Sequence, residues 1–214
     1  MGMIENLTGA LFPAKLAAMV KKEKGSVGEG LKYLVLAGVI SILLSMVSLT
    51  VSGTGTLMQA ADFIGQVVLL VLGLVVALVA IWLTAWLVSA LLKGKAEFGQ
   101  LFFALSVPAS AIQIVSAVVM FILGFIPMLG LAVAGIIGLL LWLYGFYLAY
   151  VVFRAVYGFE MMNAVISLVV YLVLTAIIGA IVLGIGLGIV AGILGLGAIG
   201  GAAAAGAFTL PSVA

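Results

Sequence analysis

The 214-residue chain is 67% hydrophobic and only 7% charged, with a formal net charge of +2, whereas about 25% of the residues of a soluble domain are charged. No soluble fold covers that much apolar surface, so we expect an integral membrane protein. The chain contains no Cys and no His, which excludes disulfides and thiolate metal sites and removes the commonest general base and metal ligand. We therefore expect no enzymatic activity, no cofactor and no nucleic-acid partner.

The first predicted element is a short amphipathic helix within residues 1–32. Its apolar side chains recur at helical spacing: Phe12, Leu16, Met19 and Val20. Its polar side is marked by lysines: Lys15, Lys21, Lys22 and Lys24. In one interpretation this is an interfacial helix held on the cytoplasmic leaflet by anionic lipids, at about 1 kcal/mol per Lys. In the other, the lysines only keep the N-terminus from crossing the membrane, and the two roles are compatible.

Five long apolar runs follow. A helix needs about 20 apolar residues to cross about 30 Å of hydrocarbon, and runs of roughly that length occur at 33–51, 63–92, 101–126, 129–153 and 163–184. The predicted fold is therefore all-α, a bundle of five transmembrane helices. The N-terminal segment 1–32, the membrane domain 33–184 and a Gly/Ala-rich extension 185–214 are the predicted divisions of the chain.

The apolar character of the last run continues to about residue 208. A single helix from 163 to 208 would be about 67 Å long, roughly twice the thickness of a membrane. Because glycines crowd its second half, either the helix breaks near Gly184 to Gly188 or the tail leaves the membrane plane, and we favour a span that ends near Gly184. Residues 185–208 are then a sixth crossing, a re-entrant element or a helical extension.

Orientation follows from the basic residues, because short loops rich in Lys and Arg stay on the cytoplasmic side. Five lysines precede the first span, two lie between the second and third, and Arg154 lies between the fourth and fifth. The remaining connections carry none. We predict a cytoplasmic N-terminus, and a C-terminus outside if there are five spans or inside if there are six.

Charged side chains are predicted at helix ends, with Asp62 as the N-terminal cap of the second span. The polar residues expected deepest in the membrane lie on the third span: Ser106, Pro108, Ser110 and Gln113. Proline frees backbone carbonyls that need partners, so this helix could border a substrate path. Alternatively, the Gln and Ser side chains bond between neighbouring helices.

Small residues repeat at every fourth position on two spans and predict close helix packing, within one subunit or between subunits. They are Gly130, Ala134 and Gly138 on the fourth span, and Gly184, Gly188 and Gly192 on the fifth. The glycine spacing in "GLGAIG" follows no predicted strand and is read as packing, not as a nucleotide site.

Three segments resemble the Yip1-domain family of membrane proteins. "LTGALFPAKLAAM" resembles the Pro-containing segment before the first span of prokaryotic members, and "GKAEFGQLFFALSVPASAIQIV" resembles the third span. "WLYGFYLAYVVFRAVYGFEMMNAVISLVVYLVL" resembles the hairpin of the fourth and fifth spans, in which a small residue, here Ala164, follows the loop. The likeness covers about residues 6–184.

The resemblance implies five spans with a cytoplasmic N-terminus. In eukaryotic relatives it also implies binding of prenylated Rab GTPases and a role in vesicle traffic. Only about 32 residues precede the first span here, which argues against GTPase binding. A short member resembles the prokaryotic forms, for which a cell-membrane location is expected.

Two functions follow from the sequence. The first is a non-enzymatic membrane-organising or adaptor protein, associating with itself or with another membrane protein. The second is a passive transporter, channel or lipid scramblase with a polar path along the third span. The two differ in whether Gln113 faces a cavity or another helix.

Overall fold

The computed structural model describes residues 2–23, 25–51, 56–126 and 129–193. Within these ranges the chain is all-helical. Two short helices are followed by five long ones: α1 (Met3–Ala10), α2 (Pro13–Lys22), α3 (Val27–Val51), α4 (Thr56–Leu92), α5 (Phe98–Leu123), α6 (Leu129–Tyr157) and α7 (Met161–Ile193). Each long helix contains a stretch apolar and long enough to cross a membrane. The predicted five-helix transmembrane bundle is confirmed.

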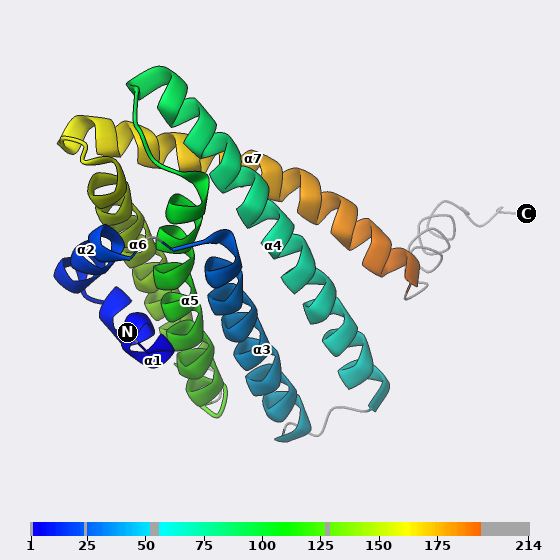
Figure 1. Ribbon diagram of the computed structural model, residues 1–214. Coiled ribbons are helices and arrows are strands. Elements are labelled where there is room, and N and C mark those ends of the chain that lie inside the picture. Colours follow the sequence, from blue (N-terminus) through cyan, green and yellow to red (C-terminus); the bar gives the residue numbers. More distant parts are fainter. Residues whose placement is uncertain (1, 24, 52–55, 127–128, 194–214) are drawn as a thin grey trace, which may run out of the picture.

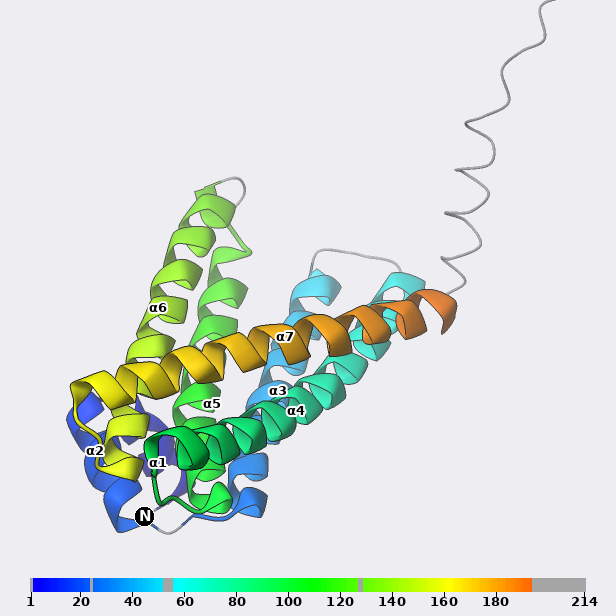
Figure 2. The same cartoon turned by 90° about the horizontal axis from the view of Figure 1, so that it is seen from above.

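Helix α5 lies at the centre of the bundle and packs against α3 on one side and α6 on the other (Figure 1). Its first half, from Leu101 to Pro108, is entirely buried. Helices α4 and α7 form an antiparallel pair that runs obliquely across the other three long helices (Figure 2). In the described chain, α7 packs against α4 and α6, and its backbone does not come close to that of α3 or α5.

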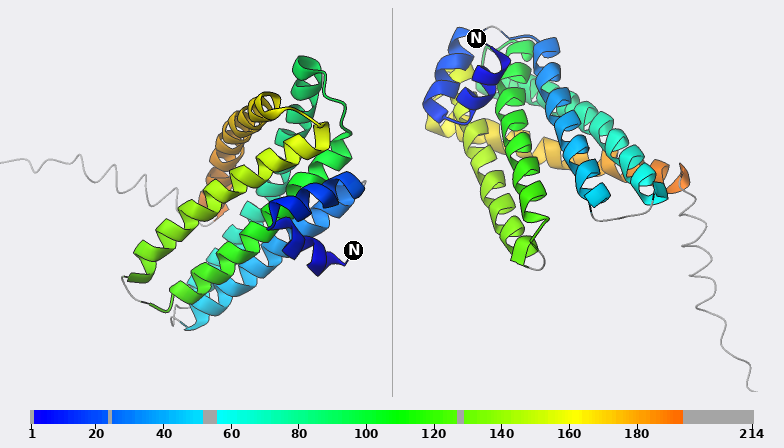
Figure 3. Two further views of the ribbon diagram at one scale, coloured as in Figure 1. Left: turned by 90° about the vertical axis from the view of Figure 1, so that its left-hand side faces the viewer. Right: turned by 90° about the horizontal axis from the view of Figure 1, so that it is seen from below.

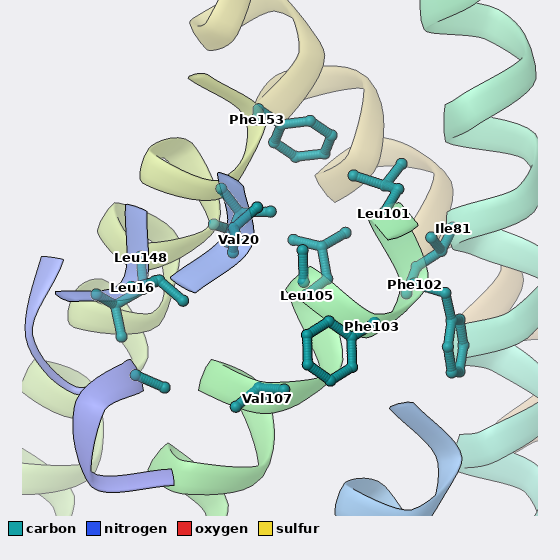
Figure 4. Packing of buried hydrophobic residues seen from close by; sticks show 14 of the residues in the cluster. Leu16, Val20, Ile81, Leu101, Phe102, Phe103, Leu105, Val107, Leu148 and Phe153 are labelled. Carbon is teal, nitrogen blue, oxygen red and sulfur yellow. The ribbon is translucent and has the colours of Figure 1, made fainter. Parts of the chain in front are cut away.

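The two N-terminal helices form a hairpin that packs against α5 and α6 (Figure 3). The predicted amphipathic helix is present as α2, and its apolar face is turned inward: Leu16 and Val20 are almost completely buried. Figure 4 shows these two side chains beside Leu148 and Phe153 of α6. The apolar stripe of α2 therefore contacts protein.

The element ends that carry basic residues gather at one end of the bundle (Figure 2). Lys32 lies in the first turns of α3, Lys93 and Lys95 lie in the α4–α5 connection, and Arg154 lies in the last turn of α6. The N-terminal hairpin lies at this same end, which we call the basic end.

Two sequence-based expectations are corrected by the helix boundaries. Helix α4 begins at Thr56, so Asp62 lies inside the helix and is not its N-terminal cap. Helix α7 continues through Gly184 and Gly188 to Ile193, so the expected break near Gly184 is wrong. The rest of the predicted extension, residues 194–214, lies outside the described residues.

Candidate functional site: an intramembrane cavity and an N-terminal hairpin

A cavity of about 760 Å³ lies between α3, α5 and α6, and Tyr171 of α7 also lines it. Aromatic and aliphatic side chains form most of its wall. Its serine and amide side chains come from two helices: Ser41, Ser45 and Ser48 of α3, and Gln113 and Ser116 of α5. The three α3 serines are spaced by four and three residues and therefore share one helix face.

Gln113 is exposed to this cavity and makes one long hydrogen bond, from its Nε2 to the Ser41 Oγ at 3.4 Å. Ser41 in turn donates to the Ala37 carbonyl at 2.8 Å. Among the described residues, no group bonds the side-chain oxygen of Gln113. An unpaired amide in an apolar surrounding is costly, so a polar ligand in the cavity would be stabilised by this side chain.

The four residues predicted as a polar site on the third span are divided by the structure. Pro108 and Gln113 line the cavity, whereas Ser106 and Ser110 do not. Both serines are buried, and their hydroxyl groups have no partner in the described chain. Ser106 lies against α3, where a Cβ at Gly30 would come within 3.1 Å of its Oγ.

A second polar group joins α3 to α4 behind the cavity wall. Gln66 Nε2 donates to Ser45 Oγ at 2.6 Å and also to Asp62 Oδ2. Ser45 Oγ lies 3.4 Å from the same Asp62 oxygen. The carboxylate therefore takes part in interhelical bonding. The signal for this contact is present in the sequence, since Asp62 and Gln66 are one helical turn apart.

The predicted lipid-facing lysines lie on the hairpin. Lys15, Lys21 and Lys22 are exposed, and Lys24 lies outside the described residues. The Lys15 ammonium sits over the Phe12 ring, 5.2 Å from its centroid. Their contact with lipid stays a prediction.

The hairpin is fastened to the bundle by hydrogen bonds at both of its ends. Tyr144 Oη donates to the Leu11 carbonyl at 2.5 Å, next to the turn between α1 and α2. Near the basic end, Asn6 Nδ2 donates to Tyr33 Oη at 3.1 Å and to Glu23 Oε2 at 3.2 Å. Asn6 is only 5% exposed, so this polar contact belongs to the core.

The predicted small-residue stripes pack differently on the two helices. A Cβ at Gly138 would lie 3.3 Å from Met120 of α5, while at Gly184 and Gly188 it would meet nothing within 4 Å. Ala134 is half-buried. The surroundings of Gly130 and Gly192 lie outside what the structure describes.

The closest glycine contacts are ones that the sequence patterns missed. Gly25 and Gly30 lie against Phe103 and Phe102 of α5, Gly38 lies against Leu70 of α4, and Gly94 lies against Tyr157 and Phe159. These glycines do not repeat at every fourth position, so a search for small-residue stripes passes over them. Close approach of a neighbour is the property they share.

The described residues contain no group of three or more acidic, His or Cys side chains that could hold a metal ion.

The outer surface of the bundle is apolar, with Trp82, Trp86 and Ile136 more than half exposed. Together with the five apolar helices, this surface defines a multi-pass integral membrane protein. The chain belongs to the Yip1-domain family, whose model matches residues 9–184. Comparison with curated proteins and with solved structures finds no significant match.

Proposed function

We propose that this protein is a non-enzymatic membrane-organising protein that acts on the cytoplasmic leaflet through its α1–α2 hairpin. The observation that carries the proposal is the hydrogen bond from Tyr144 to the Leu11 carbonyl at the turn of the hairpin. Tyr144 precedes the last residue of α6, Tyr157, by thirteen positions, or about 20 Å along the helix. The hairpin therefore extends alongside the membrane-spanning helices and occupies volume in one leaflet.

The side chains on the free surface of the hairpin suit an anionic leaflet. Ile4 is 78% exposed and Phe12 is 56% exposed, and both can contact acyl chains. Lys15, Lys21 and Lys22 are exposed and can reach lipid phosphates while their stems stay in the apolar layer. The concentration of basic residues at this end supports a cytoplasmic location for it and for the N-terminus.

A body that occupies one leaflet and leaves the other untouched makes the areas of the two leaflets unequal. The hairpin adds two helices at the basic end, and the described chain has no comparable element at the opposite end. Because the cytoplasmic leaflet is the expanded one, we expect the protein to favour membranes whose cytoplasmic face is convex. This is a structural action on the bilayer and requires no catalytic group.

The test is reconstitution of the full chain into vesicles of defined composition, with vesicle diameter measured by electron cryomicroscopy. Wild-type protein should shift vesicles that contain about 30% anionic lipid to smaller diameters. Phe12→Ser should weaken the shift because it removes the apolar contact with the leaflet. Phe125→Ser is the matched control, since Phe125 is 51% exposed but lies at the opposite end of the bundle.

Replacement of Lys15, Lys21 and Lys22 by Gln should weaken the effect in anionic vesicles and leave it unchanged in zwitterionic ones. Vesicles whose diameter does not depend on wild-type protein, or depends equally on Phe12 and Phe125, would refute the proposal.

A passive path through the bundle is the second candidate, and Gln113 in the cavity favours it. The cavity wall, however, extends toward the basic end only as far as Leu105 on α5 and Ala149 on α6. Beyond these residues Leu101, Phe102 and Phe153 fill the bundle and are fully buried. The hollow thus supports a binding site better than a continuous path, and flux of ions or labelled lipids through proteoliposomes would favour the path instead.

A further inference from the structure

We infer that the cavity between α3, α5 and α6 binds one uncharged lipid that carries hydroxyl and ester groups, of the diacylglycerol type. This site is separate from the hairpin and does not rest on the function proposed above. Its volume of about 760 Å³ falls within the range of about 300–1,000 Å³ that holds small-molecule ligands. It takes the glycerol end and the first part of the acyl chains, and the rest of the chains extends into the bilayer.

The inference begins with Gln113, which is the sixteenth of the 26 residues of α5. At 1.5 Å per residue it lies about 22 Å from Phe98 and about 15 Å from Leu123, so it is placed well inside the hydrocarbon. Its side chain is exposed, and its single bond, to Ser41, is 3.4 Å long. A polar group held at this depth requires a partner that can itself enter the membrane.

The lining of the cavity selects the charge of that partner. It offers hydroxyl groups from Ser41, Ser48 and Ser116 and the amide of Gln113, and none of the lining residues is charged. Such groups exchange hydrogen bonds with hydroxyl and ester oxygens. A lipid phosphate would enter this apolar site without a counter-charge, which is costly. The lining therefore favours an uncharged headgroup.

The rest of the wall suits acyl chains. Trp142, Phe121 and Met120 line the cavity beside the polar groups, and a flexible Met side chain adapts to chains of irregular shape. The ligand can enter laterally, because the backbone of α3 does not come close to that of α6 or α7 in the described chain. Toward the basic end the cavity is closed by the buried residues around Leu101 and Phe102. A lipid held there is retained and does not pass through.

The experiment uses the full chain in nanodiscs and a diacylglycerol with a photoreactive group near its glycerol end. Labelling should map to the lining segments of α3, α5 and α6, and unlabelled diacylglycerol should compete for it better than phosphatidylglycerol. Gln113→Leu should raise the half-saturating concentration about tenfold, since a hydrogen bond in an apolar site contributes about one decade of affinity. Gln100→Leu is the matched control on the same helix, where Gln100 bonds the Val20 carbonyl outside the cavity.

A second pair of variants changes volume instead of polarity. Ala117→Phe fills the cavity, which Ala117 lines, and should abolish labelling of the lining segments. Ala90→Phe makes the same change at an exposed position of α4 outside the cavity and should leave labelling intact. The competition on wild-type protein requires no variant, so it decides the question even if a variant fails to fold.

The inference is overturned if Gln113→Leu and wild type have equal half-saturating concentrations, if labelling maps outside the cavity, or if phosphatidylglycerol competes as well as diacylglycerol. Phe12→Ser, which tests the hairpin, should leave labelling unchanged, so failure of one proposal is distinguishable from failure of the other.

Discussion

Tyr144→Phe should release the N-terminal hairpin without altering the packing of its ring. The Tyr144 hydroxyl donates to the carbonyl of Leu11, which is the C-terminal capping residue of α1. Carbonyl groups at a helix end have no partner within the helix, so the variant leaves this one unsatisfied. The expected cost is about 1–3 kcal/mol, which raises the population of the undocked hairpin about 5- to 150-fold.

Hydrogen exchange of the full chain in nanodiscs measures this population directly, because exchange through local opening follows the opening equilibrium. Amides of α1 and α2 should exchange at least about fivefold faster in Tyr144→Phe than in wild type, while those of α5 remain unchanged. Tyr147→Phe is the control, since Tyr147 is on the same helix and 50% exposed. Unchanged exchange in Tyr144→Phe, or equal acceleration in both variants, would refute the docking of the hairpin on α6.

Two further predictions concern the core. Gly30→Ala places a Cβ 2.7 Å from the Phe102 ring, whereas the Cβ of the control variant Gly65→Ala meets nothing within 4 Å. Both variants gain about 1 kcal/mol of helix propensity. Overpacking against Phe102 costs Gly30→Ala about 1–3 kcal/mol of stability. Its thermal midpoint, followed by tryptophan fluorescence, should therefore lie below that of Gly65→Ala, and equal midpoints would contradict the close approach of α3 and α5. Ser106→Ala removes a buried hydroxyl without a partner and should raise the midpoint or leave it unchanged, while Ser167→Ala, which loses a 2.8 Å bond to the Asn163 carbonyl, should lower it. A larger drop for Ser106→Ala than for Ser167→Ala would show that Ser106 has a partner.

The five membrane helices could be predicted from the sequence because hydrocarbon thickness fixes the length of each apolar run. Helix α1 could not, because Met3–Ala10 is only eight residues long and includes Glu5 and Asn6. Its stability comes from contacts with distant residues, such as the bond from Asn6 to Tyr33. The intrinsic helix propensity of a segment does not include the stabilisation that tertiary contacts provide.

Helix boundaries depended on tertiary contacts in the same way. Asp62 was predicted as a helix cap because it stands at the start of an apolar run, but its oxygen accepts a bond from Gln66 and lies beside Ser45 of α3. A carboxylate paired in this way is compatible with a position inside α4. Similarly, Gly184 predicted a break that α7 does not have, because glycine lowers helix propensity without forbidding a helix, least of all in a membrane.

The candidate site was half predictable. Gln113 and Pro108 stood out as polar and helix-breaking residues in an apolar run, and both line the cavity. The serines of α3 were not singled out, since Ser and Thr in membrane helices usually bond their own backbone, as Ser41 does. Which of these hydroxyl groups also faces a cavity depends on the rotation of α3 relative to α5. That rotation is set by close contacts such as Gly30 with Phe102.

The bond between Leu11 and Tyr144 joins residues 133 positions apart. During synthesis at about 5–20 residues per second, the hairpin must therefore wait on the order of 10 s for the helix on which it docks. For that interval its apolar stripe has no protein partner, and the surface of the bilayer is the only apolar phase within reach. The hairpin has an amphipathic sequence, with Leu16 and Val20 on one side and Lys15 and Lys22 on the other. This sequence suits binding to the bilayer surface during synthesis as well as docking in the assembled protein.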